Sequence, residues 1–401
     1  MRVAYICADP GVPVFGTKGS SVHVQEIVRS WRRAGAEVRV YCTRLGTDRP
    51  ADLSDLPVVE IRPVPTSGAG REEAVREAAA ALAHAAVQDG CDLIYERYSL
   101  FSAALAMVAE ALRIPAVLEV NAPLIEEQRQ YRELHNAGLA ERMLCKNAAA
   151  ATVVACVSDP VVRWVGRKVP GARTLLAPNG VNTERITPRR PGPHHPNHLT
   201  VAFVGTLKPW HGVGYLLEAV ALANAGAAGR TWSTRIIGDG PCRLDLERQS
   251  AELGVGAEFT GAVSPAAVPR LMHGCDAAAA PYPHPAPGRD DYFSPLKVYE
   301  YMAAGLPTVA SAIGQLNQII AHEQTGLLVP PGDAGALADA IDRLRHDPTS
   351  RRRLGRAARQ YVMRHHTWDS VVDRIIQLAH ANRGAHVTAA RPARLVEEVG
   401  A

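Results

Sequence analysis

One stretch of the chain carries a cation and a carboxylate at a spacing that suits chemistry on a phosphorylated ligand. It reads Ser294-Pro-Leu-Lys297-Val-Tyr-Glu300-Tyr-Met-Ala-Ala-Gly305, and a loop is predicted to turn here into a helix that ends at Gly305. Positions three apart share one helix face, so Lys297 and Glu300 are expected to point together into a cleft. The helix N-terminus suits a phosphate, and ribose hydroxyls suit Glu300 as donors. A surface ion pair explains the same spacing equally well.

Two glycine-punctuated loops are further candidates for ligand contact. The first follows the predicted strand Val3–Cys7 and contains Gly16, and the second follows Leu199–Val204 and contains Lys208 and His211. Glycines let the backbone approach a ligand closely, and each loop leads toward a helix N-terminus. The first loop alone is a weak signal, because surface loops often carry such glycines, and the alternative for Lys208 in the second is an exposed loop lysine.

Four groups of residues, in order along the chain, resemble the family 4 glycosyltransferases. They are Gly11–Gly16 through His23-Val24, Pro178–Asn182, Val204–Gly212, and Ser294–Gly305 followed by Leu306–Ala310 and Thr325–Asp333. The resemblance runs from the first strand to about Trp368. It implies a retaining enzyme of the two-domain GT-B fold that uses a nucleotide-diphosphate sugar, and the S-P-L-K-x-x-E motif suggests one subgroup of that family.

The resemblance also implies roles for individual residues. Donor binding falls to Gly16, Gly205, Val263, Ser294, Leu296, Lys297 and Glu300. The residues expected to act in catalysis are Lys208, Lys297, His211 and Asn121, and those expected on the acceptor side are His23, Glu126 and Glu127. A buried structural histidine is an equal alternative for His23, and a solvated acidic first turn is an equal alternative for Glu126 and Glu127.

The phosphate-binding loop departs from the family pattern. Thr206 and His211 stand where the family places an arginine and a lysine that bind the diphosphate. A diphosphate leaving group still needs positive charge, so Lys208 and Lys297 are expected to supply it.

The carboxylate signature is also only half present. Glu300 occupies the position that binds the ribose, but Tyr292 stands eight residues earlier where the family has a second glutamate. Asp290 and Asp291 precede it and could supply a carboxylate from one position off register. The donor sugar, the base and the acceptor, whether a glycan or a small natural product, therefore stay open.

The elements that position these residues alternate between short apolar runs and helical patterns, as in parallel sheets covered by helices. Strands are predicted at Val3–Cys7, Val38–Cys42, Leu93–Tyr95, Ala116–Val120, Thr152–Val157, Thr174–Ala177, Leu199–Val204, Thr234–Ile237, Glu258–Thr260, Ala277–Pro281 and Pro307–Ala310. The first helix is expected to be capped by Ser20 or Ser21, and Asp333 to about Arg364 is expected to be helical. The fold class is therefore α/β, with two Rossmann-like, doubly wound domains that face each other across a cleft.

Composition sets the domain boundaries and the class of partner. We predict a first domain at 1–183, a Pro-rich linker at 184–198 that includes His194-His195, a second domain at 199–365, a helix at 366–383 that crosses back to the first domain, and a tail at 384–401. The net charge of +4 is too small to indicate nucleic-acid binding. No membrane span or signal peptide is expected, and peripheral membrane contact stays open. The seven cysteines show no paired spacing, so we expect reduced thiols and a cytoplasmic location.

Other classes of protein remain to be weighed. Gly238-Asp-Gly-Pro241 lacks the third glycine of a dinucleotide fingerprint, which argues against a dehydrogenase. The resemblance implies no cofactor and no metal, and no D-x-D triplet is present. A phosphorylase would need a much longer chain. A sugar-nucleotide epimerase and a non-catalytic sugar-nucleotide-binding protein stay open as alternatives.

Overall fold

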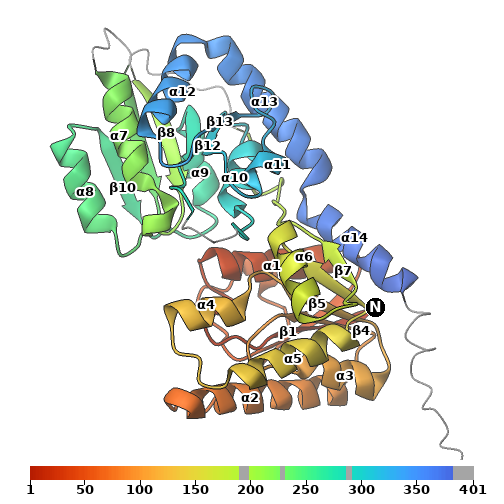
Figure 1. Ribbon diagram of the computed structural model, residues 1–401. Helices are drawn as coiled ribbons and strands as arrows, with labels where there is room; N and C mark the ends of the chain where they lie inside the picture. The colour runs from red at the N-terminus through yellow and green to blue at the C-terminus, as the bar shows by residue number, and fades with distance from the viewer. Residues whose placement is uncertain (189–197, 226–230, 286–290, 383–401) are drawn as a thin grey trace, which may run out of the picture.

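Two parallel sheets organise the computed structural model, which describes residues 1–188, 198–225, 231–285 and 291–382 (Figure 1). The first sheet has the order β3-β2-β1-β4-β5-β6-β7, and the second has the order β10-β9-β8-β11-β12-β13. The strands of the first are β1 (Arg2–Cys7), β2 (Glu37–Cys42), β3 (Val58–Glu60), β4 (Leu93–Arg97), β5 (Ala116–Val120), β6 (Val153–Cys156) and β7 (Thr174–Leu176). Those of the second are β8 (His198–Val204), β9 (Thr231–Ile237), β10 (Ala257–Gly261), β11 (Ala277–Ala280), β12 (Thr308–Ser311) and β13 (Leu327–Val329). Two doubly wound units confirm the predicted fold class.

Helices cover both faces of each sheet, which explains why most strands read as continuous apolar runs rather than alternating ones. The helices of the first unit are α1 (Gly19–Arg33), α2 (Gly68–Asp89), α3 (Ala104–Leu112), α4 (Leu124–Tyr131), α5 (Ala137–Ala150) and α6 (Asp159–Lys168). Those that follow β8 are α7 (Val213–Asn224), α8 (Arg243–Glu252), α9 (Val268–His273), α10 (Leu296–Ala303), α11 (Leu316–Ile319), α12 (Ala334–His346), α13 (Pro348–His365) and α14 (Trp368–Ala381).

The last helix, α14, packs against the first unit, although it follows the second unit in the sequence. In Figure 1 it leaves α13 and runs along the lower unit. Its apolar face, with Val372 and Ile375, joins the same core as Ile27 and Trp31 of α1. Thr367 caps α14, because its hydroxyl accepts the Ser370 N–H at 3.1 Å. The helix thus ties the two units together through an apolar contact.

One local prediction about a helix is wrong, because no serine caps α1. Its N-cap is Lys18, and the Ser21 hydroxyl instead donates a hydrogen bond of 2.6 Å to the Pro13 carbonyl. The stretch after Asp333 is helical, as predicted, and it forms two helices: Asp347 ends α12 and caps α13 by accepting the Ser350 N–H at 2.8 Å.

Every predicted strand forms, and β3 and β13 form in addition at or near sheet edges. Both are only three residues long, which left no clear periodic signal in the sequence. Of the predicted linker, residues 184–188 and 198 are described, while His194 and His195 lie outside the described residues, as does the predicted tail. No helix in the described ranges is long and apolar enough to cross a membrane.

The strand order places both glycine loops at equivalent points. In the first sheet the order reverses between β1 and β4, and in the second it reverses between β8 and β11. Ligands of such sheets bind outside the carboxyl ends of the strands at this switch point. The loops after β1 and β8 start there, so the topology brings both to the region between the sheets.

Candidate active site

A cleft of about 2160 Å³ lies between the two units, and it is lined by loops from the carboxyl ends of both sheets. Pockets for one small ligand usually measure about 300–1,000 Å³, so this cleft has room for two substrates. The predicted site residues that line it are Glu126, Glu127, Gly205, Lys208, His211, Val263, Ser294, Leu296, Lys297 and Glu300. The start of α1 and the two residues before it, residues 17–20, line it from the opposite side.

Two helix N-termini meet in this cleft. The Leu296 side chain at the start of α10 lies 3.3 Å from the point where a Cβ on Gly19, at the start of α1, would stand. The first N–H groups of a helix have no partner within the helix, and its N-terminus carries partial positive charge. Because both termini line the cleft, backbone donors from the two units face the same space.

Lys297 adds a buried cation beside these termini. Its side chain is 9% exposed, and its Nζ has no hydrogen-bond partner among the described residues. The Nζ lies 4.2 Å from the ring centre of Phe203 and 5.3 Å from that of Tyr282, so two aromatic faces support it. Burial lowers the pKa of Lys297 from its usual 10.5 to about 7. A buried amine without a carboxylate partner is suited to an anionic ligand.

Gly205 makes room for this lysine. It has a φ of +146°, and a Cβ at this position would stand 3.1 Å from the Lys297 Nζ. A side chain there would crowd the amine and strain the backbone. The need for a glycine directly after β8 thus comes from Lys297, which lies on α10 and is distant in sequence.

His211 does not replace the missing cation of the family pattern. Its Nδ1 donates a hydrogen bond to the Thr206 carbonyl. Burial, with the positive charges of Lys297 and Lys208, lowers the pKa of His211 to about 3. The imidazole is therefore neutral at physiological pH, and its Nε2 is left with a lone pair that can accept a hydrogen bond from a hydroxyl.

Lys208 lies at the mouth of the cleft rather than in its depth. Its Nζ is 5.4 Å from the ring centre of Trp210, whose side chain is half exposed. The Trp210 ring lies 6.4 Å from the ring of Tyr131 at the end of α4. Two aromatic side chains from the two units thus approach each other across the cleft entrance, with a cation beside them.

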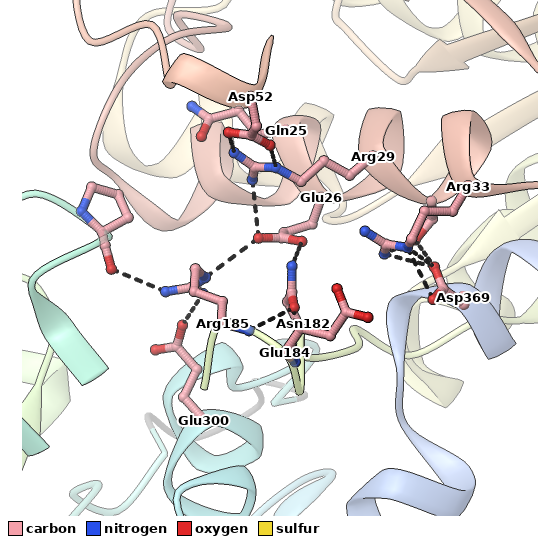
Figure 2. A network of polar contacts seen from close by, with 12 residues as sticks. Gln25, Glu26, Arg29, Arg33, Asp52, Asn182, Glu184, Arg185, Glu300 and Asp369 are labelled. Carbon is pink, nitrogen blue, oxygen red and sulfur yellow. Dashed lines mark hydrogen bonds and ion pairs between the residues drawn. The ribbon is translucent and has the colours of Figure 1, made fainter. Parts of the chain in front are cut away.

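Glu300 lines the cleft but does not pair with Lys297, so the simple surface ion pair is not what the spacing encodes. Its Oε1 accepts a hydrogen bond of 2.7 Å from the Nη2 of Arg185. Figure 2 shows Arg185 between Glu300 and Glu26 of α1. Arg185 was not predicted as a site residue, because it falls in the segment predicted as linker and has no motif of its own.

Ser294 is held by the segment that follows β7. Its hydroxyl accepts the Asn179 N–H at 3.1 Å, and its carbonyl accepts the Asn179 side-chain N–H at 2.9 Å. The motif Pro178–Asn182 therefore contributes to the site indirectly, because it holds the loop that leads into α10.

The acidic pair on α4 is engaged within the protein. Glu126 accepts the Trp164 Nε1–H at 2.7 Å and lies 3.3 Å from the Lys168 Nζ. Glu127 accepts a hydrogen bond from the hydroxyl of Tyr292, the residue that stands at the family's glutamate position. Tyr292 thus joins the second unit to the first. Asp291 also lines the cleft, and Asp290 lies outside the described residues.

Three predicted site residues do not line the cleft. A Cβ on Gly16 would stand 2.8 Å from the Ser21 Oγ, so this glycine serves the packing of its loop against α1. His23 is a buried structural histidine: it is 4% exposed, and its Nε2 lies 2.7 Å from Glu119 Oε1. Asn121 donates to the other oxygen of Glu119 at 3.0 Å. His23 and Asn121 thus contact Glu119 rather than line the cleft, and the acceptor-side role of His23 and the catalytic role of Asn121 stay predictions.

Glu119 is the shared partner of these two residues. Its carboxylate also accepts the Tyr95 hydroxyl at 2.7 Å and lies 3.6 Å from an Arg97 nitrogen. Burial alone would raise the pKa of Glu119, but His23, Arg97 and Tyr95 outweigh it and lower the pKa to about 2. Among the described residues no group of three or more His, Cys, Asp or Glu side chains is arranged to hold a metal ion.

Comparison with known families identifies the chain. Residues 17–185 match the family described as Glycosyltransferase Family 4, and residues 198–347 match the one described as Glycosyl transferases group 1. Together these matches span most of the sequence. The chain therefore belongs to the family 4 glycosyltransferases of the GT-B fold, as the motifs predicted, and it is a glycosyltransferase.

Relatives agree with this assignment, and solved structures agree with the fold. The D-inositol 3-phosphate glycosyltransferase of Salinispora tropica is 26% identical over 90% of this chain and 80% of its own length. The 2-deoxystreptamine glucosyltransferase of Streptomyces kanamyceticus is 30% identical over 40% of each chain. Sucrose-phosphate synthase of Thermosynechococcus elongatus has a TM-score of 0.72 at 22% identity, covering 96% of this chain and 100% of that one. Anabaena HepE with UDP and glucose has a TM-score of 0.69 at 19% identity, covering 95% and 100%.

Proposed function

We propose that this enzyme transfers a sugar from a nucleotide-diphosphate sugar to an acceptor hydroxyl with retention of configuration and without a metal ion. The observation that carries the proposal is the buried Lys297 amine, which has no hydrogen-bond partner within the described part of the chain and lies beside two helix N-termini in the cleft. A diphosphate is the ligand that matches this concentration of positive charge and N–H donors. Glu300, on the same helix as Lys297, then accepts the ribose hydroxyls.

In this proposal the two units divide the substrates. The donor lies mainly on the second unit, against Gly205, Val263, Ser294 and α10. The acceptor lies on the first unit, near the cleft wall formed by α4 and α6, where Glu126 and Glu127 are found. The named substrates of two relatives, inositol 3-phosphate and 2-deoxystreptamine, suggest a hydroxylated ring as acceptor.

The chemistry proposed is attack from the face that the diphosphate leaves. The bond between the sugar C1 and the phosphate oxygen breaks, the acceptor oxygen bonds to C1, and the departing phosphate oxygen takes the acceptor proton. Charge develops on the diphosphate during this step. Fixed donors aimed at that charge are the main catalytic contribution expected of the protein, and Lys297 and the two helix N-termini supply them.

The test begins with thermal unfolding in the presence of UDP-, GDP-, dTDP- and ADP-sugars, since a ligand that binds the folded state raises the melting temperature. The donor that binds is then incubated with D-inositol 3-phosphate, 2-deoxystreptamine or a glycan, and nucleotide release and the product anomer are measured. Acceptor-dependent release with a retained anomer supports the proposal. Conversion of the sugar without acceptor would indicate an epimerase. If none of the four donors raises the melting temperature, the proposal is overturned.

A further inference from the structure

Arg185 connects three separate parts of the molecule. Its Nη2 donates to Glu300 on α10 at 2.7 Å, its Nη1 donates to the Pro265 carbonyl at 3.0 Å, and its Nε lies 3.5 Å from Glu26 Oε1 on α1. Figure 2 shows these side chains in one continuous network. The arginine follows β7 and precedes β8, so it lies at the crossing between the two units and also lines the cleft.

Glu26 is the fixed end of this network. Its side chain is 0% exposed, so its charge requires partners. Oε1 accepts a hydrogen bond from the Arg29 Nη1 at 3.0 Å and faces Arg185, while Oε2 accepts the Asn182 side-chain N–H at 3.0 Å. With both oxygens engaged from different elements, Glu26 holds one orientation and presents its charge to Arg185.

Glu300 is the free end of the network. Only its Oε1 is engaged by Arg185, and its side chain is 16% exposed to the cleft. Arg185 reaches Glu300 through one charge-assisted hydrogen bond, which restrains the carboxylate at Oε1. Among the described residues the Oε2 atom has no hydrogen-bond partner, so it is available to a ligand, and a carboxylate that is already restrained loses less rotamer freedom when the ligand binds.

We propose that Arg185 is a positioning residue that orients the Glu300 carboxylate for the ribose hydroxyls of the donor, and that Glu26 of the first unit sets Arg185. This inference rests on the ribose-binding role of Glu300 in the proposed function. The orientation of the Glu300 carboxylate on the second unit therefore depends, through Arg185, on the buried Glu26 carboxylate of the first unit. The arrangement makes recognition of the ribose sensitive to how the two units are joined.

The test separates ribose recognition from general binding. Dissociation constants are measured by calorimetry for a nucleoside diphosphate and for its 2′-deoxy and 3′-deoxy analogues, with UDP, GDP or ADP chosen from the donor screen. The wild type is expected to prefer the ribonucleotide by about 10- to 150-fold, the range for hydrogen bonds to a charged group. The deoxy analogues act as an internal control for folding, because they keep the base and the diphosphate.

Four variants decide the outcome. Glu300→Gln and Arg185→Met should each reduce the ribo-to-deoxy preference by about tenfold or more while deoxy affinity changes less than about twofold. The double variant should show no further loss, because both changes remove one interaction. Arg33→Met is the matched control: it removes another guanidinium–carboxylate contact of α1, with Asp369, and should keep the wild-type preference.

Three results would overturn the inference. The first is a wild-type preference in Arg185→Met alongside a lost preference in Glu300→Gln. The second is an equal loss of ribo- and deoxynucleotide affinity in Arg185→Met, which indicates a merely structural role. If Arg185→Met does not fold, Arg185→Lys is used instead. It should show an intermediate ribo-to-deoxy preference, because an ammonium cannot match the guanidinium fork. The third refuting result is a wild-type preference in Arg185→Lys. A failure of the proposed function is recognised separately, because no nucleotide would then bind the wild type.

Discussion

Lys297 is expected to take up a proton when the donor binds. Its pKa is lowered to about 7 by burial, so close to half of the amines are neutral at pH 7 and about nine-tenths are neutral at pH 8. A nucleotide sugar carries its diphosphate esterified at both ends, so the ligand has no phosphate group that titrates in this range. Placing that dianion beside the amine restores the pKa toward its usual 10.5.

The size and sign of the effect follow from this shift. The complex holds more protons than the free enzyme, so donor affinity should be constant below about pH 7 and fall by about tenfold per pH unit above it. Proton uptake should be roughly 0.5 per donor bound at pH 7 and about 0.9 at pH 8. The fall in affinity should level off only as the pH approaches the pKa of Lys297 in the complex.

The measurement is calorimetric titration with the nucleotide sugar at pH 8 in two buffers of different ionisation enthalpy. The difference between the two observed enthalpies gives the number of protons taken up. Lys297→Met should bind with no uptake from this site, whereas Lys208→Met should keep the uptake because the buried amine is intact. Uptake close to zero in the wild type, or equal uptake in Lys297→Met, would refute the reasoning.

Four further predictions concern binding, catalysis and stability. Glu300→Ala should lose about 1.5–3 kcal/mol of donor binding by calorimetry, and unchanged affinity in a folded variant would remove it from the ribose site. Lys297→Ala should lower kcat by about 10²–10³-fold, and Lys208→Ala should lower it by the same factor or less. Near wild-type steady-state rates in both variants would mean that backbone N–H groups, and not these lysines, stabilise the diphosphate. Activity should survive EDTA, because the cleft supplies its own positive charge; loss restored by Mn²⁺ or Mg²⁺ would contradict this. The depressed pKa of Glu119, about 2 against 4.5, contributes about 3 kcal/mol of stability that is present above pH 4.5 and is lost as the pH falls toward 2. Glu119→Gln should therefore unfold at lower urea and show a shallower loss of stability on acidification; the same acid profile as wild type would exclude this carboxylate as its source.

The sequence by itself was sufficient for the fold class, the family and one wall of the cleft. These features depend on local signals: apolar runs of strand length, glycines at loop starts, and a lysine and a glutamate three residues apart at a helix start. Such signals stay within a few residues of one another. Lys297, Glu300 and Ser294 line the cleft because the chain turns from loop to helix at Pro295, which the sequence shows directly.

Only the tertiary structure decided which polar side chains face each other. His23 contacts a glutamate 96 residues away and does not line the cleft. Arg185, in the predicted linker, contacts Glu300, 115 residues away. The surroundings of the Lys297 amine come from Gly205, Phe203 and Tyr282, which lie on other strands and loops. Burial, charge partners and pKa values are properties of neighbours in space, and spacing along the chain does not encode which distant residues those neighbours will be.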